Sequence, residues 1–150
     1  MTTNILIGVV LFLMLGLSVV LQIFRTRQSP LGRVVGILSN VNQNEKYIRN
    51  FSYHRSKGKL KAGAWKKNRD KVDFLPEELR LTLSRLFEMV EEVNGRIDAA
   101  IKYQSDSYMA GIDVSKLEAP LAKSKEQLQE WIQENMHNPA YLPKKRSLFR

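Results

Sequence analysis

The sequence predicts an all-α fold, in which a single N-terminal transmembrane helix precedes a small cytoplasmic helical hairpin or three-helix bundle. Three observations lead to this prediction. A run of twenty uncharged residues lies near the N-terminus. Behind it, apolar residues recur at alternating steps of three and four, as they do along one face of a helix or a coiled coil. Proline and capping residues stand where these periodic stretches begin.

The uncharged run covers residues 5–24 and reads ILIGVVLFLMLGLSVVLQIF. A helix of twenty residues is about 30 Å long, which is the thickness of the hydrocarbon core of a bilayer. Residues 1–4 contain no Lys or Arg, whereas Arg25 and Arg27 follow the run directly. The positive-inside rule therefore predicts a cell-membrane protein with one span, with residues 1–4 outside and residues 25–150 in the cytoplasm.

A basic juxtamembrane linker, residues 25–30, leads to an amphipathic helix predicted over 31–52. Ser29 and Pro30 form its start signal, a capping hydroxyl followed by the proline of the first turn. Its apolar positions are Leu31, Val34, Leu38, Val41 and Ile48. This helix can belong to the bundle or lie along the bilayer surface. The bundle is favoured, because its polar face is mostly Asn, Gln and Ser.

Two further helices are predicted over 76–104 and 116–137, joined by a turn at 105–115. The short connection makes them an antiparallel hairpin. Their apolar stripes pack either in the core of this chain, which we favour, or as a coiled-coil seam with a partner or a second copy. The stripe residues are Leu79, Leu83, Leu86, Val90, Val93, Ile97, Leu117, Leu121, Leu128 and Trp131.

Charge divides the chain into a basic and an acidic part. Residues 25–71 hold 13 Lys or Arg against two acids, a net charge of +11, whereas residues 72–138 hold seven against 13, a net charge of −6. A basic loop is predicted over 53–75, and a basic tail over 138–150. Such asymmetry indicates a polyanion or an anionic membrane surface beside the basic part.

The basic loop is predicted to contact anionic lipid headgroups or an acidic helix face of this chain or a partner. The anchor keeps headgroups at high local concentration, and Trp is typical of the headgroup level. A nucleic acid would suit the same cations but is disfavoured, since no nucleic-acid-binding module is present. A solvated linker is the simplest alternative. The predicted contact residues are Arg25, Arg27, Lys59, Lys61, Trp65, Lys66, Lys67, Arg69 and Lys71.

No constellation of catalytic or metal-binding residues is evident. The chain has no Cys, and its two histidines, His54 and His137, have no second ligand at metal-binding spacing. We therefore predict no cofactor, no metal, no small-molecule substrate and no enzymatic activity. The predicted role is a membrane-anchored scaffold or accessory subunit of a membrane complex, which also contacts a protein partner or a second copy through its stripes. The alternative is a membrane-tethered nucleic-acid-binding protein.

Overall fold

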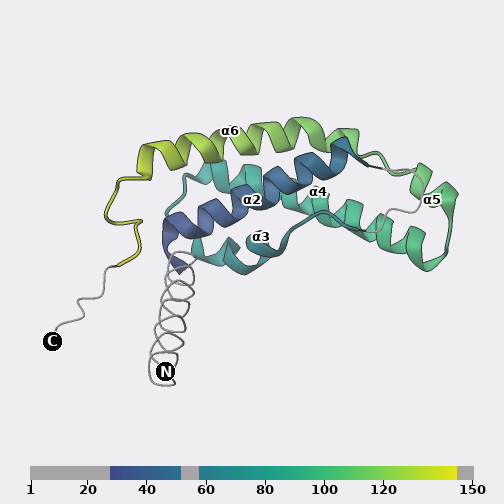
Figure 1. Cartoon of the computed structure of the whole chain (residues 1–150), viewed down its shortest axis with the longest axis horizontal. Coiled ribbons are helices and arrows are strands. Elements are labelled where there is room, and N and C mark those ends of the chain that lie inside the picture. The colour runs from purple at the N-terminus through teal and green to yellow at the C-terminus, as the bar shows by residue number, and fades with distance from the viewer. Residues whose placement is uncertain (1–27, 52–57, 145–150) are drawn as a thin grey trace, which may run out of the picture.

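The computed structural model describes residues 28–51 and 58–144, and these residues are all-α, with no strand among them. Three long helices, α2 (Pro30–Arg49), α4 (Glu77–Lys102) and α6 (Glu118–Asn135), lie side by side along the molecule (Figure 1). Helix α6 runs antiparallel to α2 and α4. Two short helices, α3 (Gly63–Asn68) and α5 (Asp106–Ala110), lie on the connections. The described residues thus form a helical bundle.

The bundle core is made of the predicted apolar stripes, packed within this one chain. All ten stripe residues on α4, α6 and the turn before α6 are buried. Helix α2 adds Val34, Ile37 and Val41, each with no exposed surface, and the fully buried amide of Asn44. Helix α2 is therefore a bundle helix, as favoured from its polar face.

The helix ends differ from the predicted ones by up to three residues. The stretch 31–52 becomes α2, with Ser29 as its N-cap: the Ser29 side chain accepts a 3.0 Å hydrogen bond from the Gly32 N–H. The predicted turn at 105–115 contains the short helix α5, capped by Ser105, whose side chain accepts from the Tyr108 N–H. A 3₁₀ turn, Ser115–Leu117, precedes α6.

The proposed membrane span is not part of the described structure. Residues 5–24 lie outside the described residues, and so do Arg25 and Arg27. Within the ranges 28–51 and 58–144, none of the helices combines the length and the apolar character needed to cross a bilayer.

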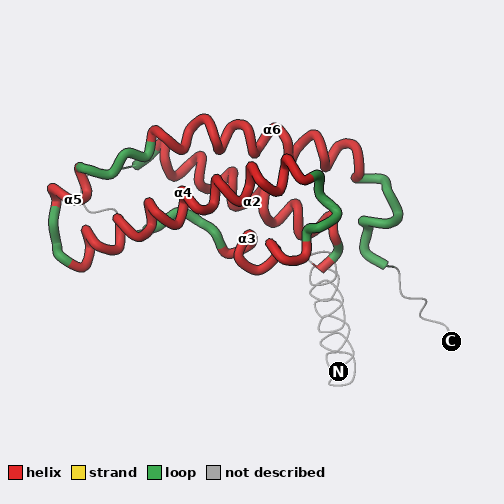
Figure 2. The backbone as a smooth tube through the Cα atoms, turned by 180° about the vertical axis from the view of Figure 1, so that it is seen from behind, coloured by secondary structure: helices red, strands yellow, loops and turns green. Residues whose placement is uncertain are grey.

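The basic stretch is more ordered than a loop. Its described part, residues 58–71, is called the basic segment below. It runs back along the bundle from the end of α2 towards the start of α4, and it contains α3 and a 3₁₀ turn, Arg69–Lys71 (Figure 2). The sequence predicts a basic loop over 53–75. Leu60, Ala62 and Trp65 are nevertheless buried.

Aromatic rings fix the C-terminal stretch to the beginning of the bundle. The Phe74, Trp131 and Tyr141 rings contact one another, with centroids 5.2–5.5 Å apart. The Leu31 N–H also donates a 3.1 Å hydrogen bond to the Tyr141 carbonyl. These contacts bring residues 141–143 next to the first turn of α2, where they help to form the groove described below.

Candidate basic interaction surface

Two asparagine side chains hold the backbone of the basic segment by paired hydrogen bonds. Asn44 of α2 donates through Nδ2 to the Lys61 carbonyl, at 2.7 Å, and accepts through Oδ1 from the Lys61 N–H. Asn94 of α4 does the same for Leu60, with an N–H contact of 2.9 Å and a carbonyl contact of 3.0 Å. Two neighbouring residues are therefore each held by a different long helix.

Further polar contacts continue along the segment. The Ala64 N–H donates a 2.9 Å hydrogen bond to Asn40 Oδ1, and the Tyr47 hydroxyl donates a 2.8 Å bond to the Gly58 carbonyl. A hydrogen bond in a protein contributes about 0.5–1.5 kcal/mol net. Several such bonds on one short stretch fix its backbone, so the segment is a bound strap rather than a loose linker.

Side chains in the first part of the segment, residues 59–62, alternate between core and solvent. Leu60 and Ala62 point inward and are buried, whereas Lys59 and Lys61 are exposed. Trp65 is 8% exposed, and its ring stacks on Phe87 with centroids 5.4 Å apart and planes 8° apart. Apolar side chains thus hold the segment against the bundle, and the cations stay outside.

Trp65 therefore differs from its prediction. It was expected to lie at the headgroup level, but the structure places its ring in the core against α4. The physical reason is that a large aromatic ring stabilises most when it is fully removed from water against another ring. The candidate surface accordingly consists of Lys59, Lys61, Lys66, Lys67, Arg69 and Lys71, without Trp65.

Two of these lysines pair with carboxylates of α4. Lys59 Nζ lies 3.1 Å from Asp98, and Lys66 Nζ lies 3.0 Å from Glu91. All four side chains are about half exposed, so each pair contributes little to stability and is screened by salt. Two cations of the basic segment are thus paired with carboxylates of α4 in the same chain.

The other cations of the segment are less neutralised. Among the described residues, no carboxylate lies within ion-pair distance of Lys61, Lys67 or Lys71. Residues 30–49 and 58–71 together carry nine Lys or Arg and two acids, whereas α4 and α6 carry six and ten. The bundle therefore has a basic part, formed by α2 and the basic segment, and an acidic part, formed by α4 and α6.

The cations form a row rather than a single cluster. Lys61 is fixed to Asn44, in the last third of α2, whereas Lys67 lies beside the first half of that helix. A helix rises 1.5 Å per residue, so Asn44 is about 22 Å from Ser29 along the α2 axis. A flat anionic surface can touch the whole row only if α2 lies roughly parallel to that surface.

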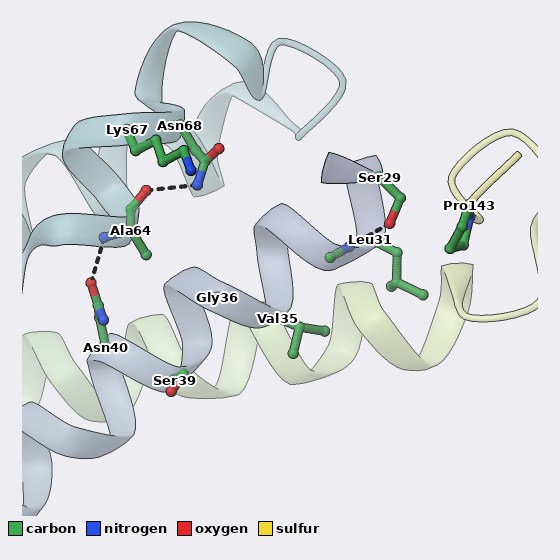
Figure 3. A pocket seen from close by; sticks show the side chains of 11 residues that line it. Ser29, Leu31, Val35, Gly36, Ser39, Asn40, Ala64, Lys67, Asn68 and Pro143 are labelled. Carbon is green, nitrogen blue, oxygen red and sulfur yellow. Dashed lines mark hydrogen bonds between the residues drawn. The ribbon is translucent and has the colours of Figure 1, made fainter. Parts of the chain in front are cut away.

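A groove separates the first half of α2 from α3. Its volume is about 540 Å³, and it ends at the C-terminal stretch (Figure 3). Among the described residues that line it, Lys67 is the only charged one and none is a carboxylate. A smaller pocket of about 290 Å³ lies near the end of α2, beside Lys46, Lys59 and Lys61. The groove lining residues are Ser29, Leu31, Gly32, Val35, Gly36, Ser39, Asn40, Ala64, Lys67, Asn68 and Pro143.

One partly buried ion pair joins α2 to α6. Lys125 Nζ donates a 2.8 Å hydrogen bond to Glu45, and Arg49 donates a second at 2.7 Å. The bond from Lys125, with the charges of both cations, holds the pKa of the Glu45 carboxyl below its ordinary value, although partial burial acts in the opposite direction. Glu45 therefore stays ionised, and its negative charge is balanced by Lys125 and Arg49 within the bundle. The basic part of the bundle keeps its net positive charge.

Metal chemistry has no candidate centre in this part of the chain. Within residues 28–51 and 58–144, no group of three or more His, Asp or Glu side chains is placed to hold a metal ion. Comparison of the chain with protein-family models, with curated proteins and with solved structures finds no match. The function proposed below therefore depends on the residues of this chain alone.

Proposed function

We propose that this chain is a non-enzymatic, single-pass membrane-anchored scaffold or accessory subunit of a membrane protein complex, whose basic segment contacts anionic lipid headgroups or an acidic protein face. The observation that supports this best is the fixed backbone of the segment. Its six Lys or Arg side chains project from a strap that is bonded to α2 and α4. Binding then costs less conformational entropy than ordering a free loop.

The proposed anchor favours the lipid surface as one partner. Residues 5–24 have the length and apolar character of a bilayer span. A Lys or Arg close to an anionic leaflet contributes about 1 kcal/mol to binding. Lys61, Lys67 and Lys71 are exposed and have no described ion pair, so they are the cations that such a surface would meet first.

A protein partner would use a different surface from the one predicted. The apolar stripes of α4 and α6 are buried in the core of this chain, so they offer no seam to a second helix. The exposed basic segment is the better candidate for an acidic partner face, because charge complementarity steers and orients association.

The nucleic-acid alternative receives less support. Binding of single strands relies on aromatic side chains on which bases stack. Trp65, the aromatic residue within the basic segment, is buried against Phe87 and offers no stacking face. The cations remain suited to phosphates, so an oligonucleotide is a necessary competitor in the test.

The test is co-sedimentation of residues 28–150 with neutral and anionic liposomes. This fragment contains every buried core residue of the described part of the chain, from Val34 to Trp131. One variant replaces four exposed cations of the segment with Gln, and a matched control removes four exposed cations from α4 and α6. The two sets are Lys61, Lys66, Lys67 and Lys71, and Arg85, Arg96, Lys102 and Lys123.

We expect binding to anionic liposomes only, with a loss in the first variant that the control does not show. Equal losses in both variants would mean that net charge, not this surface, drives binding, and would contradict the proposal. Displacement by the oligonucleotide at equal ionic strength would favour the nucleic-acid alternative. Circular dichroism of each variant checks that the bundle is intact.

A further inference from the structure

The groove between α2 and α3 has the size and lining of a small-ligand site. Its volume of about 540 Å³ lies within the range of roughly 300–1,000 Å³ typical of such sites. Leu31, Val35, Ala64 and Pro143 supply apolar walls, and Val35 is 47% exposed within a helix that otherwise buries its valines. An apolar ligand group would cover this side chain (Figure 3).

One cation stands at the edge of the apolar walls. Lys67 lines the groove. Among the described residues, no carboxylate lines the groove or lies within ion-pair distance of Lys67. Asn40 accepts from the Ala64 N–H through Oδ1, which leaves its Nδ2 as a hydrogen-bond donor. An ammonium and an amide donor next to an apolar wall suit a ligand with an anionic head and an apolar body.

Two of the residues that line the groove are glycines. Gly32 and Gly36 both face it from α2. A Cβ built at Gly36 lies 3.7 Å from the Ala64 Cβ, an ordinary van der Waals contact. Alanine therefore fits at this position, whereas a leucine side chain would extend into the groove and fill it.

The position of the groove in the chain favours a membrane lipid over a soluble anion as its ligand. Its lining begins at Ser29, five residues after Phe24, where the proposed span ends. Five extended residues reach at most about 18 Å. With the proposed span in a bilayer, the Ser29 end of the groove would lie within that distance of a leaflet, where phospholipids are far more concentrated than any soluble anion.

We propose that this groove binds one anionic phospholipid of the adjacent leaflet, with its phosphate at the Lys67 ammonium and its glycerol and upper acyl carbons along Val35 and Gly36. This inference rests on the membrane anchor of the proposed function. It adds a site for a single lipid molecule to the basic segment, whose exposed cations would otherwise attract headgroups by charge alone.

The experiment uses the full chain in nanodiscs of phosphatidylcholine with or without phosphatidylserine. The chain has no Cys, so one fluorophore can be attached at a single introduced Cys. Gly63→Cys reports beside the groove, because Gly63 is exposed and a Cβ there meets nothing within 4 Å. Gln129→Cys on the exposed side of α6 is the control. The readout is quenching by phosphatidylserine or phosphatidylcholine that carries a nitroxide near the top of an acyl chain.

We expect quenching at Gly63→Cys to exceed quenching at Gln129→Cys at least twofold, and to be stronger with the anionic quencher. Lys67→Gln should remove the preference for the anionic quencher, whereas Lys61→Gln, the same charge change beside Asn44 and outside the groove lining, should keep it. Gly36→Leu should reduce quenching at the groove to the control level, and Gly36→Ala should retain it.

Equal quenching at the two label positions, or equal effects of Lys67→Gln and Lys61→Gln, would overturn the inference. Either result would reject the lipid site in the groove. The proposed function would still stand if the chain stays in the bilayer and the cations of the basic segment still select anionic lipid. If alkaline carbonate extracts the chain from vesicles, the anchor fails, and both proposals fail with it.

Discussion

Replacing Asn44 should lower the free energy of unfolding more than replacing most other polar residues of the bundle. Its side chain has no exposed surface, and both of its functional groups bond to the backbone of Lys61. Asn44→Ala breaks two hydrogen bonds, each of which contributes about 0.5–1.5 kcal/mol. The predicted loss in the free energy of unfolding is therefore about 1–3 kcal/mol.

The neighbouring contact makes this prediction sharper. Asn94 holds Leu60, the residue next to Lys61, so the two asparagines fix one short piece of backbone from opposite helices. Once one contact is lost, the piece can move away from the other. The double variant Asn44→Ala with Asn94→Ala should therefore lose less stability than the sum of the two single losses.

Urea unfolding of residues 28–150, followed by circular dichroism at the helix band, measures these differences. Asn42→Ala is the matched control: it is the same substitution on the same helix, but Asn42 is exposed and has no described hydrogen bond. It should change stability by less than about 0.5 kcal/mol. Amide hydrogen exchange gives a second readout, because the Lys61 N–H should be protected in the wild type and should lose protection in Asn44→Ala.

The reasoning would be refuted if Asn44→Ala and Asn42→Ala had the same stability. It would also fail if the Lys61 amide of the wild type exchanged as fast as an exposed amide. Either result would mean that the basic segment is a solvated linker, and that its cations are not presented in fixed positions.

Three further predictions test other parts of the structure. Trp65→Ala should lower the free energy of unfolding by about 3–5 kcal/mol, because the ring is buried on Phe87; a loss below about 1 kcal/mol would place the ring at the surface. Gly95→Ala should raise it by about 1 kcal/mol in the same assay, since Gly95 is an exposed interior residue of α4 and an added Cβ meets nothing within 4 Å; no gain would contradict a continuous α4. Glu45→Gln should flatten the acid limb of a stability–pH profile. The hydrogen bond from Lys125 lowers the pKa of the Glu45 carboxyl in the folded state. The stability that Glu45 contributes is therefore present above its ordinary pKa of 4.5 and is lost as the pH falls through its folded-state pKa. An unchanged acid limb of the profile in Glu45→Gln would exclude the ion pair.

The helices were predictable because their signal is local and long. The stripe on α4 has six apolar residues at alternating steps of four and three, and the helix covers Glu77–Lys102 against a predicted 76–104. Periodic burial of apolar residues needs no knowledge of the partner element. The ends were less certain, since the last residues of a helix depend on local caps such as Ser105.

The asparagine contacts were not predictable in the same way. Asn44 bonds to a residue 17 positions away and Asn94 to one 34 positions away, so no local pattern reports them. By local propensity alone, the Asn-rich stretch 40–44 indicates only a weaker helix, because Asn has a modest helix propensity. The four-residue spacing of Asn40 and Asn44, which puts both on one helix face, was the available signal for a bound strap.

The basic segment was misjudged because its total charge conceals an alternation. Lys59, Leu60, Lys61 and Ala62 alternate cation and apolar side chain, which is the period of an extended strand with one buried face. Summed over the stretch, the cations suggest a solvated loop. Taken in order, they place every second side chain in the core and leave the ammonium groups outside.

The groups that attach the basic segment to the bundle are therefore different from the groups that carry its positive charge. Neighbouring cations repel one another, and a free chain of this composition would spread them apart and present them in many arrangements. Here buried Leu60 and Trp65, with the amides of Asn44 and Asn94, offset that repulsion from the inner side of the strap. The exposed cations on the outer side therefore project from a backbone that is held in place.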